Sequence, residues 1–183
     1  QLAGVPGVLE LPTDKPRPPI QTFQGGVEFS LLDSDLTQRL QQLSQESDAT
    51  LFMTLLAAFI VLMSRYTGQP DIVVGSPIAN RNSPQVEQLM GFFANTLALR
   101  GDLSGNPSFT EFLAQVRQTT LSAYAHQDLP FEMLVEKLQP ERDLSRNPLV
   151  QVMFSLQNAP QSSGDLSGLN IQNMALPIDV KAR

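Results

Sequence analysis

The sequence predicts an α/β domain built in layers, and three observations lead to this fold class. Segments with the composition of β-strands alternate along the chain with segments that have helical periodicity. Several of the helical segments begin at residues that commonly cap helices. The chain has 183 residues, of which 42% are apolar, so it is long enough to bury one substantial core.

The first 25 residues are expected to be a connector. Five prolines lie in residues 1–22 without any sustained hydrophobic period, and proline fixes φ and removes a hydrogen-bond donor. Such a segment is typical of an extended connector that follows another folded unit upstream. We therefore place the folded unit at residues 26–183. Because the chain stops just after a strand candidate, we expect it to be truncated at both ends.

The predicted strands are apolar runs rich in residues that favour extended backbone. They comprise residues 26–32, 71–81, 95–103, 149–157 and 169–180. The segment at 71–81 is continuously apolar at its start, as in a buried strand, and then runs into a loop. Residues 158–168 are expected to form a loop before the last strand.

Helices are predicted between these strands. The first begins at Asp33 or Ser34, and its apolar face is formed by Leu36, Leu40 and Leu43. A second helix follows Thr50 and ends at Gly68, with Arg65 in its last turn; because it is apolar nearly all round, it should be buried.

The third and fourth helices lie later in the chain. Ser108 and Glu111 form a capping box, and the helix that follows has one stripe made of Phe109, Phe112, Leu113, Val116, Thr120 and Tyr124. Residues 130–138 predict a short amphipathic helix with Pro130 at its start.

Composition argues against several classes of function. The net charge is −6 and no basic run is present, which argues against binding to nucleic acid. The chain has no cysteine and a single histidine, so we expect no metal site. The longest apolar run, residues 51–63, is too short to span a bilayer, and no signal-peptide pattern opens the chain. We therefore expect a cytoplasmic protein without membrane contact.

The single histidine, His126, is the first candidate for chemistry, with Asp128 two residues later. A general base needs an orienting partner, but residues i and i+2 share a face only in a strand. His126 follows a predicted helix, so Asp128 is poorly placed to orient it. The favoured interpretation is a structural one, in which the imidazole interacts with the helix C-terminus.

Three other stretches carry polar residues whose role the residues alone leave open. Residues 74–85 are either a plain turn or the edge of a ligand site. Asn95 and Thr96 either satisfy backbone groups at a strand entrance or line a site. Residues 142–149 are interpreted as a salt-bridged turn rather than a reactive centre.

Taken together, four stretches resemble the condensation domains of non-ribosomal peptide synthetases. In the family's order and spacing they are VGSPIANRN (74–82), GFFANTLALR (91–100), HQDLPFEMLVEKL (126–138) and RDLSRNPLVQVMF (142–154). The resemblance implies a lobe similar to chloramphenicol acetyltransferase, with helices on a layered mixed sheet. It also implies amide formation in a tunnel between two such lobes, which the phosphopantetheine arms of carrier proteins enter.

The family's catalytic signature, HHxxxDG, does not occur in these residues. The resemblance therefore implies the second lobe only, inactive by itself, with no catalytic residue and no directly bound cofactor. Its expected partners are the first lobe, carrier proteins and an adjacent adenylation domain. The residues expected to line the acceptor side of the tunnel, or to lead into the loop beneath it, are Ser76, Asn80, Asn95 and Thr96. The residues expected to be structural are Arg81, Arg100, His126, Asp128, Arg142, Asp143 and Arg146.

Three alternatives remain open at this stage. One is an epimerization or cyclisation relative, although the form GFFANT favours ordinary condensation. Another is a non-catalytic lobe for carrier docking or scaffolding. The third is a stand-alone acyltransferase that uses coenzyme A, against which the proline-rich connector and the two later motifs argue.

Overall fold

The structure, a computed structural model, describes residues 1–22, 25–81, 84–87, 89–140 and 143–157. Along the described chain the elements are α1 (Ser34–Glu46), α2 (Leu51–Thr67), β1 (Asp71–Ile78), α3 (Pro84–Glu87), β2 (Asn95–Asp102), α4 (Phe109–Tyr124) and α5 (Phe131–Leu138). The predicted strand at 169–180 lies outside these residues.

Helices α1, α2 and α4 begin at the residues predicted to cap them, and α2 ends at the predicted glycine. Asp33 accepts a hydrogen bond from the backbone N–H of Leu36 at 2.7 Å and starts α1. Thr50 caps α2, and Gly68 ends it in the left-handed region at φ 71°. The capping box predicted at the start of α4 is confirmed.

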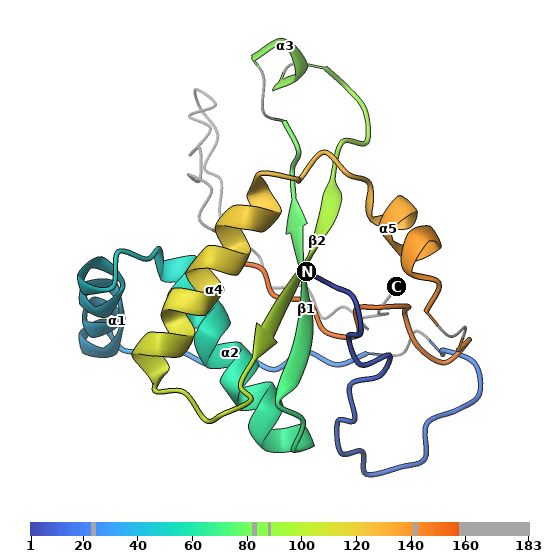
Figure 1. The fold of residues 1–183 in the computed structure, drawn as a ribbon, viewed down its shortest axis with the longest axis horizontal. Helices are drawn as coiled ribbons and strands as arrows, with labels where there is room; N and C mark the ends of the chain where they lie inside the picture. Colours follow the sequence, from blue (N-terminus) through green and yellow to red (C-terminus); the bar gives the residue numbers. More distant parts are fainter. Residues whose placement is uncertain (23–24, 82–83, 88, 141–142, 158–183) are drawn as a thin grey trace, which may run out of the picture.

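A short antiparallel pair of strands forms the centre of the described fold (Figure 1). The register runs from Asp71 opposite Asp102 to Ile78 opposite Asn95. On its other edge, β1 makes one parallel bridge between Gly75 and Met153. The sheet is therefore mixed, and the predicted α/β class of layered strands and helices is confirmed.

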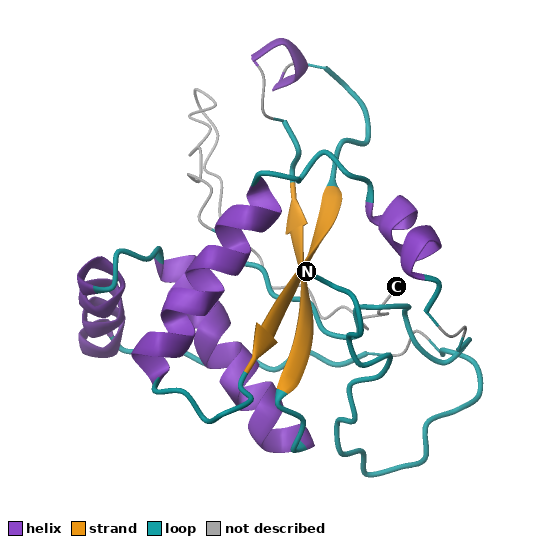
Figure 2. Cartoon of the chain, in the orientation of Figure 1, coloured by secondary structure: helices purple, strands orange, loops and turns teal. Residues whose placement is uncertain are grey.

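The two faces of this sheet are covered by different elements (Figure 2). Helices α2 and α4 pack on one face, where the main buried cluster includes Ile72, Val74, Leu97, Leu99, Ile60 and Phe112. Helix α5 packs on the other face against a smaller cluster that includes Val73, Ala98, Leu149 and Val150. The alternation of side chains along each strand separates these two sets.

Gly75 and Gly101 allow the close packing on the two faces. A Cβ at Gly101 would lie 2.9 Å from both the Ile60 and the Phe112 side chains. A Cβ at Gly75 would overlap the Met153 sulfur and would lie 2.6 Å from Val150 Cγ1. Both glycines therefore allow neighbouring groups to approach the strand backbone.

Two of the strand predictions are wrong. Residues 26–32 form no ladder with any described residue, and the Phe29 and Leu31 side chains are 93% and 97% exposed. The segment at 149–157 contributes only the bridge at Met153. β-Composition favours extended backbone, but a strand also needs a neighbour to accept and donate its hydrogen bonds.

In the described part of the chain, no single helix is long and apolar enough to cross a membrane. Helices α1 and α2 meet that criterion only as a pair, across a bend of 104°.

Candidate functional site

Asn95 joins the start of β2 to the turn between α4 and α5. Its Nδ2 donates to the carbonyl oxygens of Gln127 at 2.9 Å and Leu129 at 2.8 Å. Its Oδ1 accepts from the backbone N–H groups of Phe131 at 3.0 Å and Thr96 at 2.9 Å. All hydrogen-bonding groups of this amide are thus engaged with backbone, so the amide holds the local structure rather than presenting a free donor to a ligand.

Thr96 lines a hollow of about 590 Å³ between β2, α4 and α5. The residues that line it are mostly apolar: Gln1, Leu2, Ala3, Thr96, Leu97, Ala98, Ser122, Ala123, His126, Leu129, Leu134 and Leu138. Of the four residues expected at the tunnel, only Thr96 lines this cavity, and it is joined there by His126, which was expected to be structural.

His126 lies just beyond the end of α4 and bonds back to the helix. Its Nδ1 lies 2.9 Å from the carbonyl oxygen of Ser122. A carbonyl can only accept, so Nδ1 carries a proton, and in the neutral form of the ring Nε2 is then the acceptor. This contact is of the kind expected at a helix C-terminus. Among the described residues, the Asp128 side chain has no hydrogen-bond partner, and Asp128 is exposed.

Ser76 and Thr96, which the sequence assigned to the floor loop and the wall of one tunnel, lie on opposite faces of the sheet. Ser76 is buried and shares the face of Ile72 and Val74. It is paired with Leu97, so Thr96 points to the other face together with Ala98. Of these two residues, only Thr96 lines the cavity.

Arg81 organises the loop of residues 79–94, which projects beyond the sheet (Figure 1). Its guanidinium donates to the carbonyl oxygens of Val86 and Leu89, and to that of Gly91 at 3.2 Å. The same group lies 4.4 Å from the centroid of the Phe93 ring, a cation–π contact. Arg81 therefore ties both ends of this loop to its middle.

Asn80 stands at the start of the same loop. It has φ 50°, a left-handed conformation that asparagine tolerates better than most residues. The chain turns there, directly after β1.

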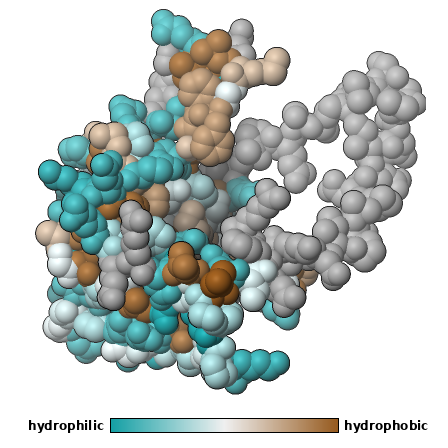
Figure 3. All heavy atoms as spheres, turned by 90° about the vertical axis from the view of Figure 1, so that its right-hand side faces the viewer, coloured by the Kyte–Doolittle hydropathy of each residue, from teal (hydrophilic) through white to brown (hydrophobic). Residues whose placement is uncertain are grey.

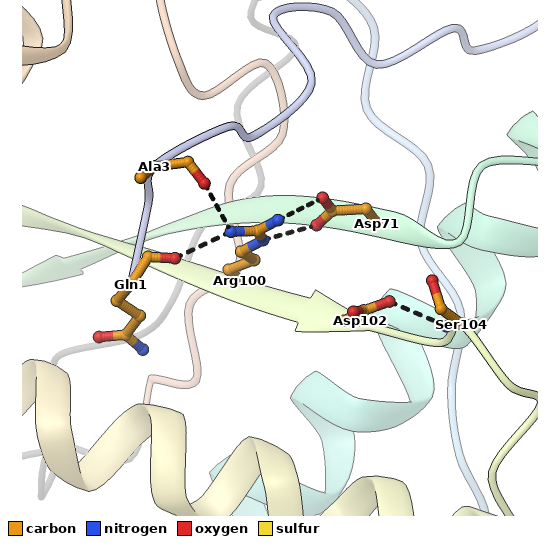
Figure 4. A network of polar contacts seen from close by, with 6 residues as sticks. All are labelled: Gln1, Ala3, Asp71, Arg100, Asp102 and Ser104. Carbon is orange, nitrogen blue, oxygen red and sulfur yellow. Dashed lines mark hydrogen bonds and ion pairs between the residues drawn. The ribbon is translucent and has the colours of Figure 1, made fainter.

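Arg100 forms a bidentate ion pair with Asp71 across the two strands (Figure 4). The Nε–Oδ1 and Nη2–Oδ2 distances are 2.9 and 2.7 Å. Hydrogen bonding to Asp71 raises the pKa of Arg100 above its usual value. Its Nη1 donates to the carbonyl oxygens of Gln1 at 3.0 Å and Ala3 at 3.1 Å, which holds the N-terminal residues against the sheet.

The turn around Asp143 is closed by local hydrogen bonds. Asp143 accepts from the backbone N–H of Ser145 at 2.8 Å, and Arg146 Nε lies 3.5 Å from its carboxylate. Hydrogen bonds from Ser145 lower the pKa of Asp143, and Arg146 and Arg17 lower it further. Arg142 lies outside the described residues.

Sequence reasoning missed the partners in these contacts. Asp71 carries no local sign that it pairs with Arg100, because the strand register alone brings the two together. The carbonyl of Ser122 and the backbone of residues 127–131 also have no side-chain signature.

The comparison with protein families decides what this fold is. The family model for the condensation domain matches residues 1–180. The chain belongs to the condensation domain family.

Known relatives of this condensation domain chain are far longer than the chain itself. It is 54% identical over 176 residues to a linear gramicidin synthase of Brevibacillus parabrevis, a match that covers 96% of this chain and 3% of that protein. Among solved structures, it resembles a four-domain non-ribosomal peptide synthetase bound to AMP and glycine, with a TM-score of 0.83, 28% identity and coverage of 86% of this chain and 12% of that one. It also resembles the X-domain from teicoplanin biosynthesis, with a TM-score of 0.79, 33% identity and coverage of 83% of this chain and 34% of that one.

Proposed function

We propose that this chain is the second lobe of a condensation domain that joins two carrier-bound thioesters through an amide bond. The family match over residues 1–180 carries the proposal. In this reaction the α-amine of the acceptor attacks the carbonyl carbon of the donor thioester. A C–N bond forms and the C–S bond breaks. The donor's phosphopantetheine arm leaves as a thiol and takes up the proton that the amine loses.

The chemistry and the positioning are divided between two lobes in this proposal. The sequence has a single histidine, so a paired-histidine signature has to come from another part of the synthetase. The role of this lobe is to hold the two thioester arms in register. Well-oriented reactions reach effective molarities of about 10⁵–10⁸ M, so positioning alone contributes much of the rate.

The loop of residues 79–94 is proposed to extend beneath the tunnel and contact the first lobe. Its tip exposes apolar side chains: Leu89 is 53% exposed, Met90 fully and Phe92 92%. Hydrophobic side chains gather on this loop at the top of the molecule (Figure 3). Exposed apolar patches of this kind are typical of contact surfaces, and Arg81 holds the loop in a defined shape.

The test is amide formation by the complete condensation domain, including the residues encoded upstream of Gln1. Donor and acceptor carrier proteins are loaded with aminoacyl groups, and the dipeptidyl product on the acceptor carrier is measured by mass spectrometry. We expect product from the complete domain, and none from residues 1–183 alone. We also expect none after the second histidine of the upstream HHxxxDG signature is changed to alanine. An upstream sequence without that signature, or no product from the complete domain, would overturn the proposal.

A second candidate function is the docking of another protein without catalysis. One observation favours it: the X-domain from teicoplanin biosynthesis, 33% identical to this chain, has also been solved as a complex with OxyB. A docking lobe would bind a protein partner yet form no amide when joined to its upstream sequence. The same assay therefore separates the two functions.

A further inference from the structure

The cavity between β2, α4 and α5 has the size of a ligand site. Its volume of about 590 Å³ lies within the range of roughly 300–1,000 Å³ typical of small-molecule pockets. Leucine side chains from β2, the α4–α5 turn and α5 form much of the wall: Leu97, Leu129, Leu134 and Leu138.

The polar side chains of the cavity are few. Thr96 and Ser122 contribute hydroxyl groups, Gln1 contributes an amide, and His126 contributes its ring. Because Nδ1 of His126 donates to the carbonyl oxygen of Ser122, Nε2 of the neutral ring can accept a hydrogen bond from a ligand. None of the lining residues is Asp, Glu, Lys or Arg.

Residues 1–3 form the rest of the cavity wall, and hydrogen bonds to Arg100 hold them against the sheet. Nη1 of Arg100 donates to the carbonyl oxygens of Gln1 and Ala3, and its Nε and Nη2 donate to the carboxylate of Asp71. The wall is therefore tied to the sheet by charge-assisted hydrogen bonds, which are stronger than neutral ones.

These features select the chemistry of the occupant. A free aminoacyl group carries an ammonium ion, and no lining carboxylate offsets the desolvation of that charge. A peptidyl group that is acylated at its N-terminus carries only amides, which the hydroxyl groups and Nε2 can satisfy. Aliphatic side chains match the leucine wall.

We propose that this cavity binds an N-acylated peptidyl segment with aliphatic side chains, and that an amide N–H of the segment donates to His126 Nε2. This inference rests on the proposed function for its biological source, since a growing peptide on a carrier is such a segment. The role of His126 is to orient the segment, and the apolar wall selects its side chains.

The probe is N-acetyl-leucyl-leucine methylamide added to the 183-residue chain. His126 is the only histidine, so the proton resonances of its ring report on the cavity without interference. We expect saturable shifts of these resonances. Leucyl-leucine methylamide, which has a free amine, and N-acetyl-seryl-serine methylamide should each bind at least about tenfold more weakly, because one adds an unpaired charge and the other removes apolar contact.

Substitutions on the cavity wall provide the structural test. Ala123→Leu fills part of the cavity and should weaken probe binding about tenfold, whereas Ala125→Leu, an exposed position just beyond the same helix, should leave it within about twofold. If Ala123→Leu does not fold, Thr96→Val removes one hydroxyl from the wall at nearly constant volume. It should weaken binding about threefold to tenfold, the effect of losing one hydrogen bond.

Failure of this inference is distinguishable from failure of the proposed function. Amide formation by the complete domain, together with no shift of the His126 resonances or equal binding of all three probes, would overturn the cavity assignment alone. Selective probe binding without amide formation would retain the cavity and overturn the proposed function.

Discussion

Replacement of Asn95 by alanine tests whether this residue holds the α4–α5 turn. The substitution removes two donated and two accepted hydrogen bonds, three of them partly buried. A net hydrogen bond contributes about 0.5–1.5 kcal/mol, and water can reach part of this junction. We therefore expect the free energy of unfolding to fall by about 2 kcal/mol. In a chain of this size, that loss corresponds to a decrease in Tm of about 4–8 °C.

The assay is urea unfolding followed by circular dichroism, with Asn147→Ala as the matched control. Asn147 is exposed, and its side chain makes no hydrogen bond with any described residue. Its replacement should change stability by less than about 0.5 kcal/mol. Equal unfolding midpoints for the two variants would refute the structural role of Asn95 and return it to the group of tunnel-lining candidates.

Two further predictions concern packing and pH. Gly75→Ala places a Cβ against the Met153 side chain and should lower the free energy of unfolding by about 1–3 kcal/mol. The control, Gly7→Ala, has open space around it and should be nearly neutral in the same urea assay. Similar unfolding midpoints for the two variants would contradict the packing argument. Hydrogen bonds from Ser108 lower the pKa of Glu111 in the folded protein. The ionised carboxylate therefore stabilises the fold at pH values above its unfolded pKa, and this contribution is lost as the pH falls through the lowered folded pKa. The stability difference between the wild type and Glu111→Gln should therefore shrink on acidification from about pH 7 to about pH 3, and a constant difference would count against it.

Local chemistry made the helices predictable. Asp33, Thr50 and Ser108 each cap the helix that follows, and Gly68 ends α2, because these signals act within a few residues and need no tertiary partner. The same holds for the apolar faces of α2 and α4. The family was also predictable, because four motifs occur in the family's order along the sequence. The match to the condensation domain model covers all four and confirms the prediction.

The strands were only partly predictable because a ladder has two sides. Residues 71–78 and 95–102 pair with each other, and both predictions held apart from their ends. Residues 26–32 have a similar composition but no partner among the described residues, so the prediction failed. The short helix at Pro84–Glu87 has no strong sequence signal and was missed.

Local signals were enough to predict the starts of α1, α2 and α4, the two central strands and the family, because each depends on contacts close in the chain or on a linear pattern. Tertiary structure alone decided the candidate site. The register of β1 and β2 places Ser76 on the buried face and Thr96 at the cavity. The turn after α4 brings His126 to the same cavity. The backbone of this turn also hydrogen-bonds to the side-chain amide of Asn95. Side chains from distant segments meet only once the sheet and the helices have packed. The motifs therefore identified these residues as candidates but did not predict the face of the sheet on which each side chain lies.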